Sequence, residues 1–209
     1  MSPLPVQMED HWVTQPGVDT TRPQLMWFML VGDHPQVAGL ARLGQARLAG
    51  LPGLDLVPQE WLHMTTLIAG FADEITPHQV DVMAAQARRL LTGVPPVMIT
   101  LSRVLYHPRA VMLAAQPSEA LEPVLRAVQQ ATRLGTGRDG KLHHEPWTPH
   151  VTLAYGNSAR PAGPVIEALG RELPRQRVTI SSISLVSQAP EQLWTWHLVT
   201  QVPFGNPHG

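Results

Sequence analysis

The chain has 209 residues, of which 44% are hydrophobic and 15% are charged, and this composition is typical of a globular protein and excludes a disordered one. The formal net charge is −1 and Lys141 is the only lysine, so the sequence lacks the basic stripe with which proteins bind duplex DNA. There is no cysteine, no secretory signal and no apolar run of about 18 residues, so we expect a cytoplasmic protein without disulfides, thiolate chemistry or a membrane span.

The hydrophobic pattern and the turn residues predict an alternation of strands and helices. Residues 1–23 are polar and punctuated by proline, and we expect an irregular arm there, followed by a single domain over residues 24–209. The predicted strands cover residues 24–31, the second half of 58–70, 97–106, 110–115, 150–155, 178–187 and 193–202. The predicted helices cover residues 35–49, 76–92, 118–134 and 161–169, with Thr76 and Ser118 as N-caps. This mixed order predicts an α+β fold whose two halves have a similar architecture.

A His-x-Thr pattern occurs once in each half of the chain, at His63–Thr65 and at His150–Thr152. One copy is expected by chance, but two copies in matching strand contexts are more specific. Because residues i and i+2 of a strand point to the same face, each histidine should share a face with its threonine. The intervening and following apolar residues should point into the core, namely Met64, Val151 and Leu153.

This combination of side chains suits the cleavage of a phosphodiester. The reaction needs a base that activates water and an acid that protonates the leaving oxygen, and two imidazoles can supply both near neutral pH. The hydroxyl groups of Thr65 and Thr152 can donate to the nonbridging oxygens, where charge develops in the transition state. We therefore predict catalytic roles for His63 and His150, substrate-binding roles for Thr65 and Thr152, and no metal and no cofactor.

The two motifs and their surroundings, Trp61–Thr65 and Trp147–Tyr155, closely resemble the two-histidine (2H) phosphoesterase superfamily, which includes the bacterial 2′-5′ RNA ligase-like proteins. The resemblance implies a bilobal, pseudo-duplicated fold with two antiparallel or mixed sheets around a central cleft and helices outside. It also implies hydrolysis of the 2′,3′-cyclic phosphate of an RNA end or a nucleotide, with reversible 2′-5′ RNA ligation in some members. Many members have a basic residue where this chain has Tyr155, and strict alternation would point Tyr155 away from His150.

Several alternatives stay open at this stage. Either histidine could be structural, either threonine could be a plain strand residue, and His143, His144 and Glu145 could form a metal site with His150. The cleft could also belong to a binding module that holds a nucleotide or an RNA terminus without turnover. We expect the partner to be an RNA terminus or a cyclic nucleotide, and the protein to be a monomer.

Several other side chains each have two possible roles. Trp61 could stack on a base or pack at a lobe interface, and three arginines could contact phosphate or remain solvated, namely Arg103, Arg109 and Arg138. Three further histidines have the same ambiguity, namely His34, His107 and His197.

Overall fold

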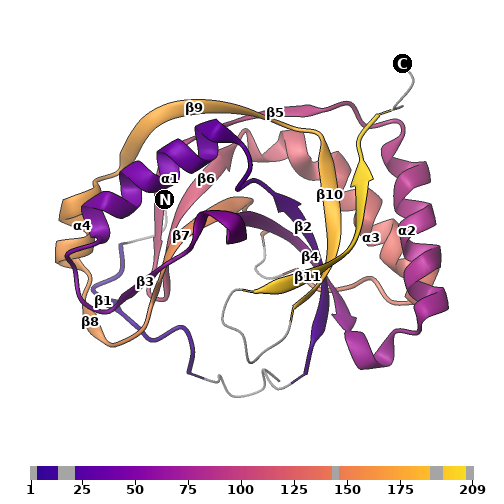
Figure 1. The fold of residues 1–209 in the computed structure, drawn as a ribbon, viewed down its shortest axis with the longest axis horizontal. Helices are drawn as coiled ribbons and strands as arrows, with labels where there is room; N and C mark the ends of the chain where they lie inside the picture. The colour runs from indigo at the N-terminus through magenta and orange to yellow at the C-terminus, as the bar shows by residue number, and fades with distance from the viewer. Residues whose placement is uncertain (1–3, 14–21, 143–145, 189–194, 206–209) are drawn as a thin grey trace.

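The structure is a computed structural model that describes residues 4–13, 22–142, 146–188 and 195–205. Over these ranges it contains four α-helices and eleven strands, and every strand pair is antiparallel. The strands form a four-stranded sheet, a five-stranded sheet and one short pair, with the helices on the outside (Figure 1). The fold class is therefore α+β, with antiparallel sheets, as the sequence predicts.

The first sheet has the strand order β11-β10-β2-β4. Its strands are β2 (Gln24–Leu30), β4 (His63–Phe71), β10 (Ser182–Gln188) and β11 (Trp196–Pro203). Two helices pack against each other and cover it, α2 (Pro77–Leu91) and α3 (Glu122–Thr136), with α3 in contact with β4 and α2 with β11. The fully buried Trp27 of β2 donates from Nε1 to Oγ1 of Thr132 on α3 at 3.0 Å, which links this sheet to its helix layer.

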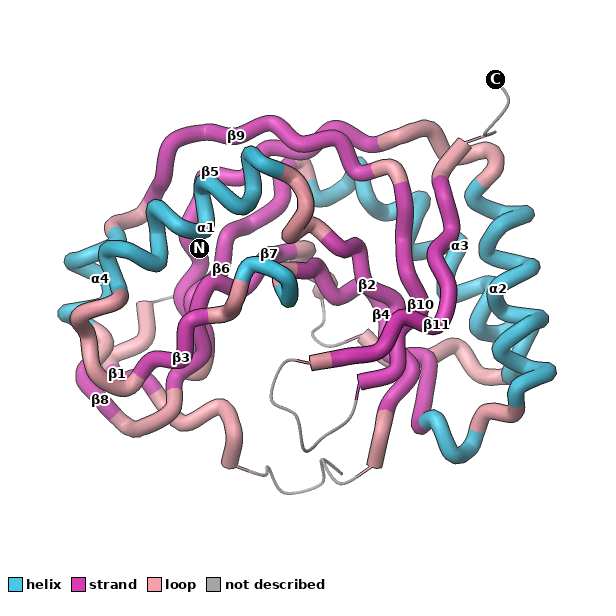
Figure 2. Tube along the Cα trace, viewed as in Figure 1, coloured by secondary structure: helices cyan, strands magenta, loops and turns pink. Residues whose placement is uncertain are grey.

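The second sheet has the strand order β3-β7-β6-β5-β9. Its strands are β3 (Leu54–Leu56), β5 (Val97–His107), β6 (Ala110–Gln116), β7 (His150–Gly156) and β9 (Glu172–Ile180). Two helices cover it, α1 (Pro35–Leu48) and the short α4 (Gly163–Leu169), and α1 contacts β7, β9 and α4. Figure 2 shows these two helices on the opposite side of the molecule from α2 and α3.

Each sheet forms a lobe with the helices that cover it, the four-stranded sheet in the first lobe and the five-stranded sheet in the second. The two lobes exchange helices. Helix α1 follows β2 of the first sheet along the chain but packs on the second sheet, and α3 follows β6 of the second sheet but packs on the first. Each lobe therefore contains segments from both halves of the sequence.

The predicted strand over residues 178–187 is wrong, because two strands occupy this region. Strand β9 ends at Ile180 in the second sheet, and β10 begins at Ser182 in the first sheet, so the chain passes between the sheets at Ser181. The apolar alternation slips by one residue at this point, from Val178 and Ile180 to Ile183 and Leu185, but the slip does not reveal that the chain changes sheets.

The start of the predicted helix over residues 118–134 also differs. Residues Ser118–Leu121 form a 3₁₀ turn, and α3 begins at Glu122. Pro123 explains the difference, because it has no N–H with which to bond the carbonyl of residue 119 and its ring would clash there. Ser118 makes no capping bond, whereas the predicted cap at Thr76 is confirmed by a reciprocal capping box with Gln79.

Part of the N-terminal arm packs on the second lobe. Within the described residues 4–13, strand β1 (Gln7–Met8) pairs with β8 (Arg160–Pro161), and the side chain of Met8 is buried in the main core. The close approach of the arm depends on Gly156, where a Cβ would lie 2.2 Å from the carbonyl oxygen of Glu9. Among the described residues, no helix has both the length and the apolar character that a membrane span requires.

Candidate active site

The two His-x-Thr motifs lie on neighbouring strands of different sheets. Strand β4 carries the first motif, β7 carries the second, and the two strands are in contact where the lobes meet. The segment that leads into β7 is tied to β4 because Trp147 donates from Nε1 to the carbonyl oxygen of Thr65 at 3.1 Å. The fold thus brings the two motifs, far apart in the sequence, to one place.

On β4 the pairing register places the motif side chains on a common face. His63 is opposite Leu30 and Thr65 is opposite Phe28, and both partners are on one face of β2. Met64 is fully buried on the other face, as the alternation predicts. Thr66 forms a β-bulge, because the register skips one residue there. After the bulge, Ile68 returns to the face of His63, opposite Met26.

Strand β7 repeats this arrangement. His150 is opposite Ala114 and Thr152 is opposite Met112, while Val151 and Leu153 are fully buried, as predicted. The register skips one residue between Thr152 and Ala154, so Leu153 forms a bulge. Both motifs are therefore followed by a bulge directly after the threonine.

The expectation that Tyr155 points away from His150 is wrong, and the bulge at Leu153 is the reason. Tyr155 is opposite Ala110, which is on the same face of β6 as the partners of His150 and Thr152. The inserted residue shifts the alternation by one, so Tyr155 shares the face of His150. Its side chain is hydrogen-bonded to that of Thr152, and burial raises the pKa of its hydroxyl.

The two imidazoles make matching hydrogen bonds. Nδ1 of His63 is 2.7 Å from the carbonyl oxygen of Trp61, and Nδ1 of His150 is 2.7 Å from that of Thr148. A carbonyl oxygen can only accept, so each Nδ1 carries the proton. In the neutral ring each Nε2 is then an acceptor that can exchange protons with a substrate.

The two histidines are close enough to influence each other. Burial lowers the pKa of His63 to about 4, the hydrogen bond to Trp61 opposes this shift, and the charge of His150 adds to it. His63 is therefore neutral at pH 7 in the free protein.

An aromatic cluster supports His63. The ring of Phe28 stacks on the imidazole with the centroids 3.9 Å apart and the planes 15° apart. Trp196 packs edge-on against Phe28 at 6.4 Å and against Trp61 at 5.1 Å. Trp61 lies in a 3₁₀ turn (Gln59–Trp61) and packs against the main core, so it contributes to packing around the site.

The other candidate residues have different surroundings. Arg109 pairs with Glu9 at 3.3 Å, Arg138 pairs with Glu74 at 2.6 Å, and Arg103 on β5 is opposite Glu172 of β9. The alternative metal residues 143–145 lie outside the described residues. In the ranges that the structure does describe, no three His, Asp or Glu side chains gather as a metal site would require.

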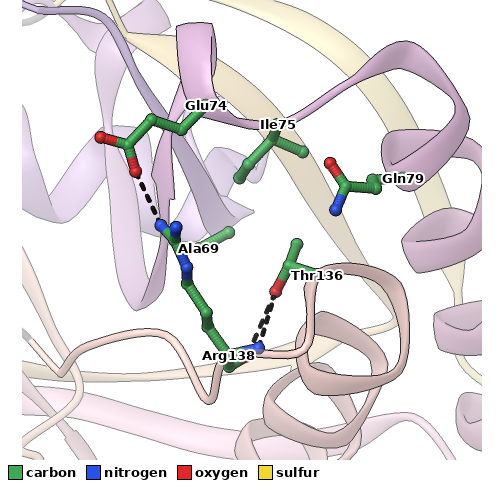
Figure 3. Close-up of a pocket in the computed structure, with 6 residues that line it drawn as sticks. All are labelled: Ala69, Glu74, Ile75, Gln79, Thr136 and Arg138. Atoms are coloured by element: carbon green, nitrogen blue, oxygen red, sulfur yellow. Dashed lines mark hydrogen bonds and ion pairs between the residues drawn. The ribbon is translucent and has the colours of Figure 1, made fainter.

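A small pocket lies away from the two motifs, between the turn after β4, α2 and the end of α3 (Figure 3). Its volume of about 40 Å³ is enough for water but not for a nucleotide. Glu74 and Arg138 are ion-paired at its edge, so the pocket does not offer an unpaired charge to a ligand. We therefore do not assign the activity to it.

A known family of proteins contains both His-x-Thr motifs of this chain in its matched region. The model of the family described as "2'-5' RNA ligase superfamily" matches residues 35–191, which contain both motifs. The chain belongs to this superfamily. None of the curated proteins compared matches the chain.

Several solved structures share the fold of this chain. The protein TT0787 of Thermus thermophilus is 16% identical, with a TM-score of 0.64 over 88% of this chain and 100% of its own. Escherichia coli LigT, solved with 3′-AMP, is 15% identical, with a TM-score of 0.62 over 88% and 99%. The PDE domain of MHV ns2 is 13% identical, with a TM-score of 0.59 over 80% and 100%. These similarities show the 2H phosphoesterase fold.

The structure adds residues that the motif does not indicate. Phe28 lies on a strand that is apolar on both faces, so its sequence does not single it out. His11 and Trp12 come from the N-terminal arm and contact Tyr155, with His11 stacked at 4.2 Å and Trp12 at 5.2 Å between centroids. The one signal in the sequence is that His11 and Trp12 are the only aromatic side chains in residues 1–23.

Proposed function

We propose that this chain is a metal-independent phosphodiesterase that opens the 2′,3′-cyclic phosphate of an RNA end or a nucleotide, with His63 and His150 as its acid–base pair. The observation that supports this most is the matched pair of imidazoles, each with Nδ1–H bonded to a carbonyl and each with a threonine on its own face. Structures of the same fold support the substrate class, since LigT was solved with 3′-AMP and MHV ns2 contains a PDE domain.

His63 is unprotonated at neutral pH, so its Nε2 is available to act as the base. In hydrolysis, Nε2 of His63 would take a proton from water while the water oxygen forms a bond to phosphorus. The bond from phosphorus to the 3′ oxygen breaks, and His150, entering as imidazolium, returns a proton to that oxygen. The product is a 2′-phosphate, and neither proton transfer requires a metal ion. Thr65 and Thr152 would hold the nonbridging oxygens during this step.

The direct test is an assay with 2′,3′-cyclic AMP in the presence of excess EDTA. We expect turnover to a 2′-phosphate that survives chelation. His63→Ala and His150→Ala should each lower kcat by about a hundredfold or more without loss of the folded state, as monitored by circular dichroism. His78→Ala is the matched control, because His78 is exposed at the start of α2.

Three outcomes would overturn this proposal. Loss of activity with EDTA and its recovery with zinc would indicate metal catalysis. Binding of the nucleotide without product would indicate a binding module. Equal activity of His78→Ala and His63→Ala would show that the first motif has no catalytic role.

A further inference from the structure

Tyr155 is positioned by the N-terminal arm as well as by its own strand. His11 stacks on the Tyr155 ring at 4.2 Å with the planes 29° apart, and Trp12 contacts the same ring at 5.2 Å. The first contact is stacked and the second is edge-on. The bulge at Leu153 turns the Tyr155 side chain toward the face of Thr152.

The arm itself is held by several directional contacts. The N–H of Glu9 donates to the carbonyl of Pro108 at 2.6 Å, and the N–H of His11 donates to that of Gly156 at 2.8 Å. Nε1 of Trp12 donates to Oδ2 of Asp55 at 2.8 Å, and Asp55 is opposite Tyr155 on β3. The aromatic rings of the arm are therefore fixed against the second lobe.

We propose that Tyr155 is a positioning residue for Thr152, and that the arm segment from Glu9 to Trp12 holds Tyr155 in that position. This inference rests on the proposed function. The contact between the two side chains is a hydrogen bond between hydroxyl groups. If Tyr155 donates to Thr152, the threonine hydrogen can point at a phosphoryl oxygen. Such a chain of donors orients and polarises the final hydroxyl.

The hydroxyl of Tyr155 has a proton with which to donate in this bond. A tyrosine hydroxyl is protonated at neutral pH at its ordinary pKa near 10, and burial raises the pKa of Tyr155 further. The first motif has no equivalent, because the residue at the corresponding place after its bulge is Ile68, which has no hydroxyl. The two threonines should therefore respond differently to removal of the Tyr155 hydroxyl.

A double-mutant cycle tests the inference. Tyr155→Phe keeps the ring and its stacking but removes the donor, and we expect kcat on 2′,3′-cyclic AMP to fall about three- to tenfold, with a smaller change in KM. In the Thr152→Ala background, Tyr155→Phe should cause no further loss. In the matched Thr65→Ala background, Tyr155→Phe should lower kcat by the same factor as in the wild-type protein, so that the fold-losses of the two substitutions multiply.

The role of the arm is tested with Gly156→Ala, whose Cβ would clash with the Glu9 carbonyl and displace the arm. We expect a loss similar to that of Tyr155→Phe, and no further loss when the two changes are combined. His11→Ala is a second variant, which removes only the stacking ring and leaves β7 unchanged. It should also lower kcat.

The outcomes separate this inference from the proposed function. Absence of turnover by the wild-type protein would overturn both. If the wild-type protein is active, two results would overturn the positioning role alone. One is that Tyr155→Phe leaves kcat unchanged. The other is that Tyr155→Phe lowers kcat by the same factor in the Thr152→Ala and Thr65→Ala backgrounds. Full activity of both Gly156→Ala and His11→Ala would overturn the role of the arm.

Discussion

The ring of Phe28 stacks on the imidazole of His63, with centroids 3.9 Å apart and planes 15° apart. Phe28 belongs to β2 and is almost completely buried, so the plane of the imidazole is set by a neighbouring strand. The hydrogen bond from Nδ1 to the carbonyl of Trp61 fixes the rotation of the ring within that plane. Together the two contacts determine where Nε2 points.

Replacement of Phe28 by leucine should weaken both the position and the burial of His63. Since burial is the main cause of its low pKa, we expect the pKa of His63 to rise from about 4 toward 6.5 in the Phe28→Leu variant. We also expect kcat to fall several-fold, because the ring would lose its fixed orientation. NMR titration of the histidine ring protons and steady-state kinetics measure the two effects.

Phe204→Leu is the control for Phe28→Leu, since Phe204 is also buried in the core but has no ring contact with His63. Both variants should lower the free energy of unfolding by about 1–2 kcal/mol. Only Phe28→Leu should change the pKa of His63, and an equal shift in both variants would argue against the stacking effect.

The pH dependence of catalysis should reflect the low pKa of His63. The profile of kcat/KM reports the free protein, and a base must be unprotonated to act. We therefore expect kcat/KM to fall as the pH drops through about 4, instead of through 6.5 as for an unperturbed histidine. A pH series of kcat/KM in a constant-ionic-strength buffer measures this limb, and a midpoint near 6.5 would contradict the role of His63 as base.

Stability should also decrease toward acidic pH. Burial lowers the pKa values of both His11 and His63 to about 4, whereas in the unfolded chain both should titrate near 6.5. Between pH 6.5 and 4 the unfolded state therefore binds more protons, and the free energy of unfolding falls as the pH drops through this window. Each histidine contributes a slope of at most about 1.4 kcal/mol per pH unit. Urea unfolding of wild type and His11→Gln at pH 7 and pH 5 should show a weaker pH dependence in the variant.

The hydrogen bond between Trp27 and Thr132 should be important for the first lobe. Both side chains are fully buried, and Thr132→Val would keep the shape of the side chain but leave Nε1 of Trp27 without an acceptor. We expect a loss of about 1–3 kcal/mol in the free energy of unfolding. The exposed Thr92→Val is the control, and similar midpoints of urea unfolding for both variants would contradict this expectation.

Much of the site follows from local sequence patterns. The positions of His63 and Thr65 on one face, with Met64 buried on the other, require only the two-residue period of a strand. The same period fails at Tyr155, because nothing in the sequence marks Leu153 as the bulged residue. A bulge depends on how the partner strand pairs, and this is a property of the tertiary structure.

In the fold, the elements set by local signals were predictable from the sequence, and the pairings between distant segments were not. The helix from Pro77 to Leu91 follows from its cap and its proline, which act locally. The transfer of the chain between sheets at Ser181 and the pairing of β1 with β8 depend on contacts between segments far apart in the chain. Local propensity contains no information about such contacts.

The exchange of α1 and α3 between the lobes affects how the protein can be divided. A fragment that ends after β6 would lack α3, β10 and β11, and its first sheet would expose the apolar surface that these elements cover. The complementary fragment would lack α1, which covers the second sheet. Despite its duplicated architecture, the molecule is therefore expected to unfold in a single cooperative transition, and neither half of the chain should be stable when produced alone.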